Sequence, residues 1–155
     1  MPGDREDREG HVFVGPAGRE LDKALARVGI ERADLYITNA VKHFKFSERG
    51  KRRIHEAPKK SEIDACLPWL RAELRVVRPH VLVILGAVAG RALFGSGFRL
   101  GAVRGRPIDS DLAPVVTATI HPAAILRAPD GKAREAEREA FTRDLEAAAR
   151  ALAAR

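Results

Sequence analysis

The stretch Lys51-Arg52-Arg53-Ile54-His55 contains the residues best suited to chemistry on a charged ligand. Three consecutive cations would suit a phosphate backbone, because Lys and Arg side chains bind phosphate oxygens. His55 follows two residues later, and a histidine can act as a nucleophile or proton carrier because its free pKa lies near neutral pH. The polar residues 47–60 around the stretch predict a long loop, and such loops are often functional. The plainer interpretation is a solvated basic loop.

Apolar periodicity predicts the elements that must position this loop. Short β-rich runs predict three strands, and longer runs with helical spacing predict four helices. The predicted strands span residues 34–41, 81–85 and 114–120, and the predicted helices span residues 16–28, 61–77, 87–94 and 133–153. The run 81–85 is apolar on both faces, as expected for a parallel strand covered by helices on each side. Alternating helices and strands predict a parallel sheet sandwiched between helices.

Helix ends and buried stripes support these ranges. Pro16 fits the first position of a helix, where its missing N–H costs nothing. Ser61 with Asp64 three residues later predicts a capping box. The predicted buried stripes contain Leu21, Leu25 and Val28 in the first helix, Ile63, Leu67, Leu70, Leu74 and Val77 in the second, and Phe141 and Leu145 in the last. Residues 1–14 and 98–108 are predicted to be irregular.

Several polar residues should meet at one edge of this sheet. Ligands of open parallel sheets bind at the carboxyl ends of the strands, where Asn39, Gly86 and His121 lie, and the loop with His55 leaves the same edge. An Asn amide suits the carbonyl and imide N–H of a pyrimidine, and Phe13 could stack on such a base. Each residue also has a plainer interpretation, as a turn cap, a core side chain or a structural histidine.

Composition limits the class of protein. Lys and Arg total 28 against 21 Asp and Glu, which gives a net charge of +7 and favours a polyanionic partner, whether DNA or RNA. The 45% hydrophobic content and the length of 155 residues predict a single globular domain, residues 1–155. No apolar run approaches the roughly 20 residues of a membrane span, and residues 1–10 are too charged for a signal peptide, so we expect a cytoplasmic protein without membrane partners. The single cysteine, Cys66, excludes an intramolecular disulfide.

Four ordered motifs resemble those of a known family. They are Pro2-Gly3-Asp4, Phe13-Val14-Gly15-Pro16-Ala17-Gly18, Thr38-Asn39-Ala40-Val41-Lys42 and His121-Pro122. In order and spacing, over nearly the whole chain, they resemble the uracil-DNA glycosylase superfamily, nearest its iron-sulfur family 4. The loop that ends at His55 is similar to the loop that marks the UdgX subfamily. The resemblance implies a three-layer α/β/α sandwich with a central parallel sheet.

The resemblance also implies an activity and roles for residues. UdgX-like proteins act in base excision: they remove uracil from DNA, preferably single-stranded, and a loop histidine then attacks the sugar C1′ to leave a covalent protein–DNA adduct. Carried over, His55 is the nucleophile and His121 stabilises charge on the uracil O2, with Asp4 as a third catalytic residue. The implied substrate-binding residues are Gly3, Asp4, Phe13, Asn39, Lys51, Arg52, Arg53 and Arg127. Asn39 would read uracil, Phe13 would stack on it, and the protein would act as a monomer.

The segment after the last predicted strand resembles the loop that enters DNA beside the flipped nucleotide. Ile125 or Leu126 would be the apolar wedge, and Arg127 would lie at a phosphate. Ala123 and Ala124 stand where the family usually has serines. Their hydroxyl contacts would be lost, although backbone N–H groups could still bind phosphate.

The start of the sequence departs from the family pattern. Relatives have a strand before the position of Pro2 that ends in a catalytic Gly-Glu pair, and upstream a Cys-x-x-Cys that ligates a [4Fe-4S] cluster. This sequence contains neither, so we expect a missing first strand and an N-terminal truncation, through a late start site or a fragment. His43 and Cys66 match the other two ligand positions. Such clusters need about four protein ligands, so the family's cluster would have an incomplete site here.

Three functions are compatible with the sequence. The first is a UdgX-type glycosylase that crosslinks itself to DNA through His55. The second is an ordinary glycosylase in which water attacks the sugar and free abasic DNA is released. The third is a DNA-binding module without catalysis, because the glutamate and the first strand are absent.

Overall fold

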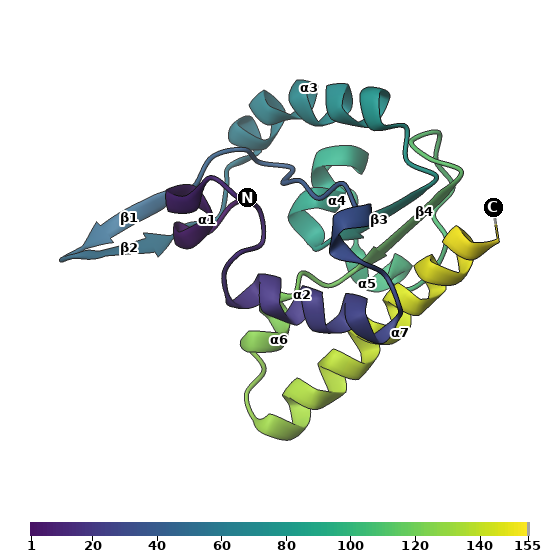
Figure 1. The fold of residues 1–155 in the computed structure, drawn as a ribbon. Helices are drawn as coiled ribbons and strands as arrows, with labels where there is room; N and C mark the ends of the chain where they lie inside the picture. Colours follow the sequence, from purple (N-terminus) through teal and green to yellow (C-terminus); the bar gives the residue numbers. More distant parts are fainter. Residues whose placement is uncertain (155) are drawn as a thin grey trace.

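The computed structural model describes residues 1–154 and contains a small sheet between helices (Figure 1). In chain order the elements are α1 (Asp4–Glu9), α2 (Pro16–Arg27), the 3-10 helix η1 (Arg32–Asp34), β1 (Phe46–Arg49), β2 (Arg52–His55), α3 (Lys60–Val77), β3 (Val81–Leu85), α4 (Ala87–Phe94), α5 (Leu100–Val103), β4 (Val115–Thr119), α6 (Ala123–Leu126) and α7 (Gly131–Ala153). Of the helices in this part of the chain, none combines the length and the apolar character that crossing a bilayer requires.

β3 and β4 form the parallel sheet on which the layers are built. They pair in register from Val81 opposite Val115 to Leu85 opposite Thr119. Side chains alternate across the sheet, so that Val83 packs on the cluster formed with α2 and α7, whereas Ile84 packs on the cluster that includes α4 and α5. Figure 1 shows α3 and α4 on one side of the strands and α2 and α7 on the other. The predicted α/β/α arrangement with a parallel sheet is therefore confirmed.

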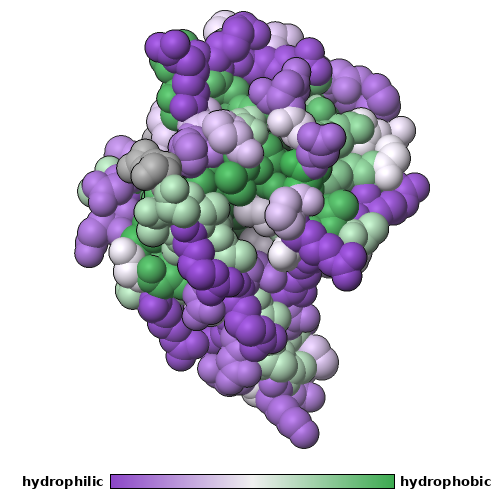
Figure 2. Space-filling view, turned by 90° about the vertical axis from the view of Figure 1, so that its right-hand side faces the viewer, coloured by the Kyte–Doolittle hydropathy of each residue, from purple (hydrophilic) through white to green (hydrophobic). Residues whose placement is uncertain are grey.

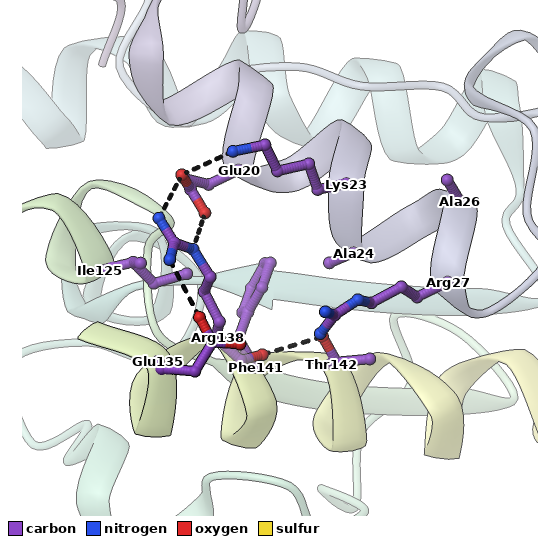
Figure 3. Close-up of a pocket in the computed structure, with 10 residues that line it drawn as sticks. All are labelled: Glu20, Lys23, Ala24, Ala26, Arg27, Ile125, Glu135, Arg138, Phe141 and Thr142. Carbon is purple, nitrogen blue, oxygen red and sulfur yellow. Dashed lines mark hydrogen bonds and ion pairs between the residues drawn. The ribbon is translucent and has the colours of Figure 1, made fainter. Parts of the chain in front are cut away.

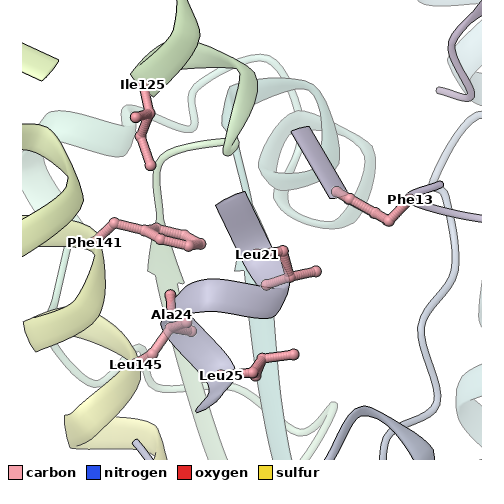
Figure 4. Close-up of a cluster of buried hydrophobic side chains, with 7 residues drawn as sticks. All are labelled: Phe13, Leu21, Ala24, Leu25, Ile125, Phe141 and Leu145. Atoms are coloured by element: carbon pink, nitrogen blue, oxygen red, sulfur yellow. The ribbon is translucent and has the colours of Figure 1, made fainter. Parts of the chain in front are cut away.

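The core between α2 and α7 follows the predicted stripes. Its seven buried residues are Phe13, Leu21, Ala24, Leu25, Ile125, Phe141 and Leu145 (Figure 4). Phe141 is fully buried, and Leu21, Leu25 and Leu145 are each no more than 4% exposed. The helical periodicity of α2 and α7 thus predicted the correct inner faces, because both helices cover the same side of the sheet.

The strand predicted at residues 34–41 is wrong. η1 takes up its start, and residues 35–41 join no strand ladder within residues 1–154. Leu35 and Ile37 pack on the α2–α7 cluster, while Ala40 and Val41 are buried beneath α3. The apolar side chains of this segment are therefore packed against the core, as expected. The segment is not a strand, because a strand also needs a hydrogen-bonded neighbour.

β3 is less buried than its apolar sequence predicted. Only Ile84 is fully buried, and the other four residues of the strand are partly exposed. Within the described chain β3 pairs with β4 along one edge only. Figure 2, which views the molecule from the right-hand side of Figure 1, shows hydrophobic residues gathered in a central area bordered by hydrophilic side chains.

Two short helices lie where irregular structure was predicted. α1 lies within the predicted N-terminal loop, and the pairs Arg5–Glu9 (2.6 Å) and Arg8–Asp4 (3.0 Å) stabilise it by joining residues four apart. Gly10, with φ 70°, ends it in the left-handed conformation. α5 forms a single turn within residues 98–108.

The N-terminus of α3 is capped differently from the prediction. The helix begins at Lys60, and the Lys59 N–H donates to the Glu62 carboxylate at 2.6 Å, so the proposed pairing of Ser61 with Asp64 is wrong. Most of the predicted stripe is buried or partly buried, but Val77 is 37% exposed. The helix ends at Val77, its predicted last residue, with Arg78 as its C-cap.

The long loop predicted around the basic stretch contains a β-hairpin. β1 and β2 pair antiparallel from Phe46 opposite His55 to Arg49 opposite Arg52. Gly50, with φ 61°, supplies the left-handed position of the turn. A short-range alternation of polar and apolar residues was too weak to reveal these strands. The hairpin places His55 at the end of β2, paired with Phe46, instead of in an irregular loop.

A buried ion pair joins α2 to α7. Glu20 is 5% exposed, and Arg138 donates to its carboxylate from Nε at 2.7 Å and from a terminal nitrogen at 3.0 Å (Figure 3). These hydrogen bonds hold the pKa of Glu20 below its usual value. The pair borders a cavity of about 420 Å³ whose lining includes Ile125 but none of the predicted catalytic, substrate-binding or metal-ligating residues.

Replacing Arg138 with Met should destabilise the fold, because the Glu20 carboxylate would remain buried without its partner. We expect a loss of about 2 kcal/mol, less than for a fully buried pair because the Arg138 side chain keeps 29% exposure. Urea unfolding measures this change. Arg143→Met, an exposed position on the same helix, is the matched control, and equal losses in the two variants would contradict the role of the pair.

Candidate active site

His121 lies at the carboxyl end of β4, beside the end of β3. The Gly86 N–H donates to the Thr119 carbonyl at 2.9 Å, which joins the two chain segments as they leave the sheet. A Cβ on Gly86 would lie 2.9 Å from the His121 Cβ, and Gly86 also has φ 89°, so this position requires glycine. The predicted meeting of Gly86 and His121 at the strand ends is confirmed.

The environment of His121 keeps its imidazole neutral. Burial lowers its pKa to about 4, and the charges of the Met1 amino group, Arg127 and His55 act in the same direction. Its Nδ1 accepts a hydrogen bond from the Ala123 N–H at 3.1 Å. A neutral imidazole that accepts at Nδ1 carries its proton on Nε2, so the other side of the ring is a hydrogen-bond donor.

Phe13 lies directly against this histidine. The two ring centroids are 5.5 Å apart and the rings are inclined by 26°. Phe13 is only 8% exposed and belongs to the α2–α7 core. It is therefore a core side chain that also borders His121. An aromatic ring fixed in this way is a rigid surface beside the donor of His121.

His55, the last residue of β2, also has a lowered pKa. Partial burial is the main cause, and the positive charges of the Met1 amino group and Arg127 add to it. Its ring is tilted against Phe44 with centroids 5.9 Å apart and is still open to solvent. The positive charge of Arg127 lowers the pKa of both His55 and His121. The structure therefore brings these three predicted residues close enough for their charges to interact.

Arg53 anchors the hairpin to α1. Its guanidinium donates to Asp4, to Asp7 at 2.7 Å and to the Asp4 carbonyl at 3.2 Å. It also lies over the rings of Phe44 and Phe46, 5.0 and 4.8 Å from their centroids. Of the three consecutive cations, Arg53 thus stabilises the hairpin, because its charge is already paired.

The other cations of the hairpin differ from Arg53. Lys51 and Arg52 are exposed at and after the turn, where they are free to approach a polyanion. The Asp4 carboxylate accepts hydrogen bonds from Arg8 and from Arg53. These bonds lower its pKa, and the bond from Arg8 has the larger effect. Its carboxylate is therefore ionised and committed to the contact between α1 and the hairpin.

A carboxylate that the sequence interpretation missed lies beside Gly3. Glu6 accepts the Gly15 N–H at 2.8 Å, and a Cβ on Gly3 would lie 2.7 Å from its other carboxylate oxygen. Glu6 thereby ties α1 to the start of α2. The prediction of an irregular N-terminus hid this contact, which required a helix to aim the side chain.

Asn39 lies in the irregular segment beneath α3. It is partly exposed, and neighbouring Thr38 and Lys42 are held to Glu73, with Lys42 Nζ at 2.6 Å from the carboxylate. These contacts fix the backbone on both sides of Asn39. Its amide has no hydrogen-bond partner within residues 1–154, so it is available to a ligand.

The segment after His121 corrects two expectations. Ile125 is fully buried in the core, so Leu126, at 37% exposure, is the apolar side chain that could enter DNA. The N–H groups of Ala123 and Ala124 are not free for phosphate, because they donate to Nδ1 and to the carbonyl of His121. Arg127 is exposed at the end of this turn.

His43 and Cys66 alone supply too few ligands for a cluster within the described residues. Cys66 is buried, with its sulfur 3.4 Å from the Lys42 N–H, whereas His43 is exposed. Between Met1 and Ala154, no group of three or more His, Cys, Asp or Glu side chains could hold a metal. Two candidate ligands do not match the four that an iron–sulfur cluster requires.

Taken together, these observations define an α/β protein with two histidines whose pKa values are lowered, a fixed aromatic ring beside one of them, and exposed cations nearby in the chain. The chain belongs to the uracil-DNA glycosylase superfamily, whose sequence profile, described as "Uracil DNA glycosylase superfamily", matches residues 1–146.

Relatives of this chain are named as uracil-DNA glycosylases. The type-4 enzyme of Pyrobaculum aerophilum is 36% identical, over 83% of this chain and 65% of the relative. The type-4 enzyme of Thermotoga maritima is 38% identical, over 81% of this chain and 62% of the relative. A type-5 enzyme of P. aerophilum is 36% identical over 56% of this chain and 41% of the relative. The chain thus spans less than two thirds of the length of these relatives.

Arg53→Met should loosen the hairpin, because it removes the ion pairs to α1 and the cation over two aromatic rings. We expect the hairpin amides to exchange with deuterium about tenfold faster. Arg52→Met, on the same strand but exposed, is the control and should leave exchange unchanged. Equal exchange in both variants would show that Arg53 does not hold the hairpin.

His121 should remain neutral well below the usual histidine pKa. A two-dimensional ¹H–¹⁵N titration should give a midpoint at about pH 4 and a proton on Nε2 above it. Since the unfolded chain binds this proton at higher pH, folding stability should fall as the pH drops from about 6.5 to 4. A midpoint near 6.5 would contradict the burial of this ring.

Proposed function

We propose that this protein is a uracil-DNA glycosylase of the UdgX type, which excises uracil from single-stranded DNA and becomes joined to the sugar C1′ through His55. The observation that carries the proposal is the common neighbourhood of His55 and His121, both with pKa values shifted toward the neutral form. A neutral imidazole can donate or attack, whereas an imidazolium can only donate. The two histidines therefore suit two different steps.

The first step is the departure of the base. The bond between C1′ and uracil N1 breaks, its electron pair leaves with uracil, and negative charge develops on the uracil oxygens. His121 offers an Nε2–H fixed by the Ala123 hydrogen bond, which suits stabilisation of the uracil O2. A neutral imidazole that polarises a substrate oxygen is a known catalytic arrangement. Asn39 reads the base, and Phe13 stacks on it.

The second step forms the covalent bond between the protein and the DNA. The imidazole lone pair of His55 forms a bond to C1′ of the oxocarbenium-like sugar, the resulting imidazolium loses its N–H proton to solvent, and the uracil anion takes up a proton. The lowered pKa of His55 keeps that lone pair available at neutral pH. Arg53 holds the hairpin against α1, which limits the positions His55 can adopt.

Phosphate contacts would come from the exposed cations. Lys51 and Arg52 lie at the turn of the hairpin that carries His55 at its base, and Arg127 follows the short helix after His121. None of the three has a hydrogen-bonded partner for its side chain among residues 1–154, so each can bind a backbone phosphate. A single strand suits this shallow arrangement because presenting an unpaired base costs least there. Leu126 can then pack beside the displaced base.

Two other functions are each favoured by one observation. The solvent exposure of His55 favours ordinary turnover, in which water reaches C1′ and releases abasic DNA. The engagement of Asp4, Asp7 and Glu6 in ion pairs or hydrogen bonds favours a binding module, since none of these carboxylates is free to assist base departure.

His55→Ala should abolish the covalent adduct. Wild-type protein mixed with uracil-containing single-stranded DNA should give a band that survives SDS, and the variant should give none, with at least a 100-fold loss of adduct rate. His80→Ala is the control, because His80 precedes β3 at the opposite end of the sheet.

The same assay separates the alternatives. Repeated uracil release without any adduct by the wild type would select the turnover enzyme. Tight binding with neither base release nor adduct would select the binding module. An adduct that persists in His55→Ala would exclude His55 as the nucleophile.

A further inference from the structure

Phe13 has a backbone conformation that its sequence does not favour. Its φ is 51°, in the left-handed region where side chains crowd the following carbonyl. Arg78 is the other non-glycine residue with positive φ in the described chain, and it caps the end of α3, a common place for this conformation. Phe13 ends no helix, so other contacts must hold it.

Arg32 provides those contacts. Its guanidinium donates to the Val12 carbonyl at 2.6 Å and to the Phe13 carbonyl at 3.2 Å, the two carbonyls on either side of the Phe13 N–Cα–C unit. The same guanidinium donates to Asp22 of α2 at 2.7 Å. Because the guanidinium is planar and presents several N–H groups at once, it can fix both carbonyls in one orientation.

α2 closes the other side of this segment. A Cβ on Gly18 would lie 1.8 Å from the Phe13 carbonyl oxygen, so the first turn of α2 abuts that carbonyl directly. The Phe13 carbonyl is therefore confined between the backbone of α2 and the guanidinium of Arg32. Rotation of the Phe13 peptide is blocked as long as Arg32 is in place.

This confinement sets the direction of the Phe13 ring. The ring leaves the chain toward His121 and packs at one end of the core cluster, apart from Phe141 and Leu145 (Figure 4). The hydrogen bonds of the Arg32 side chain go to Val12, Phe13 and Asp22, and none goes to His121 or His55. The bonded route from Arg32 to the site therefore runs through Phe13.

We propose that Arg32, held by Asp22, is a positioning residue that fixes the left-handed conformation of Phe13 and so aligns its ring with His121 for the base. This inference rests on the proposed glycosylase function for the identity of that base. The contacts themselves are independent of it. Without the clamp, Phe13 would relax toward an ordinary extended conformation and its ring would leave His121.

The test compares Arg32→Met with Arg27→Met, a matched exposed arginine on α2. Two readouts are needed: the upfield ring-current shift that Phe13 imposes on the His121 ring protons, and the single-turnover rate of uracil release at saturating single-stranded DNA. Arg32→Met should lose the ring-current shift and slow release about 10-fold or more, because misplaced groups lose catalytic alignment. Affinity for uracil-free DNA should not change, and Arg27→Met should behave as the wild type.

A double-mutant cycle separates alignment from general stability. In a Phe13→Leu background, which keeps an apolar side chain in the core, Arg32→Met should cause no further loss of rate. Arg32→Lys, which keeps the charge but not the planar fork, should recover the rate only in part.

The outcomes are distinguishable. A retained ring-current shift in Arg32→Met, or an equal rate loss in the Phe13→Leu background, would overturn the clamp. A lost shift in a protein whose wild type releases no uracil would uphold the clamp and overturn the proposed function instead.

Discussion

The parallel pairing of β3 with β4 is the constraint on which the rest of the site depends. Its register ends both strands at the same level, where the Gly86 N–H bonds to Thr119 and the missing side chain of Gly86 admits His121. This close approach buries the imidazole, and burial removes its charge. A larger residue at position 86 would displace His121 from Phe13 and from the Ala123 N–H. The position of the His121 ring and its lowered pKa therefore both depend on the close approach of Gly86.

The hairpin depends on a different interaction. A two-stranded hairpin has little stability alone, and β1 and β2 pair with no other strand in the described residues. Arg53 compensates by joining the hairpin to the acidic face of α1 and by covering two of its aromatic rings. Of the three adjacent cations, Arg53 therefore has a structural role, whereas Lys51 and Arg52 remain exposed. The net charge of the sequence does not distinguish these two roles.

Local patterns predicted six of the twelve elements in the described chain. α2, α3, α4, α7, β3 and β4 follow periodicities or stop signals that reside within each segment. Several of the failures involve long-range partners, whereas α1 and the hairpin are local elements whose sequence patterns were too weak to reveal them. Residues 34–41 have the composition of a strand but pair with no other strand. Ile125, which the sequence suggests as an exposed wedge, is buried in the core between α2 and α7. The amides of Ala123 and Ala124 were counted as free because their acceptors on His121 appear only in the folded turn.

The sequence by itself determined the layered α/β class, the family and the identity of the histidines, aromatic ring and cations that meet at one edge. These follow from residue type and spacing, which are local quantities. Only the tertiary structure decided which charges are neutralised, which histidine is buried, and that Arg32 holds Phe13 in a left-handed conformation. The reason is physical: burial, pairing and backbone confinement depend on atoms that are distant in the chain, and their contacts exist only after the layers have packed.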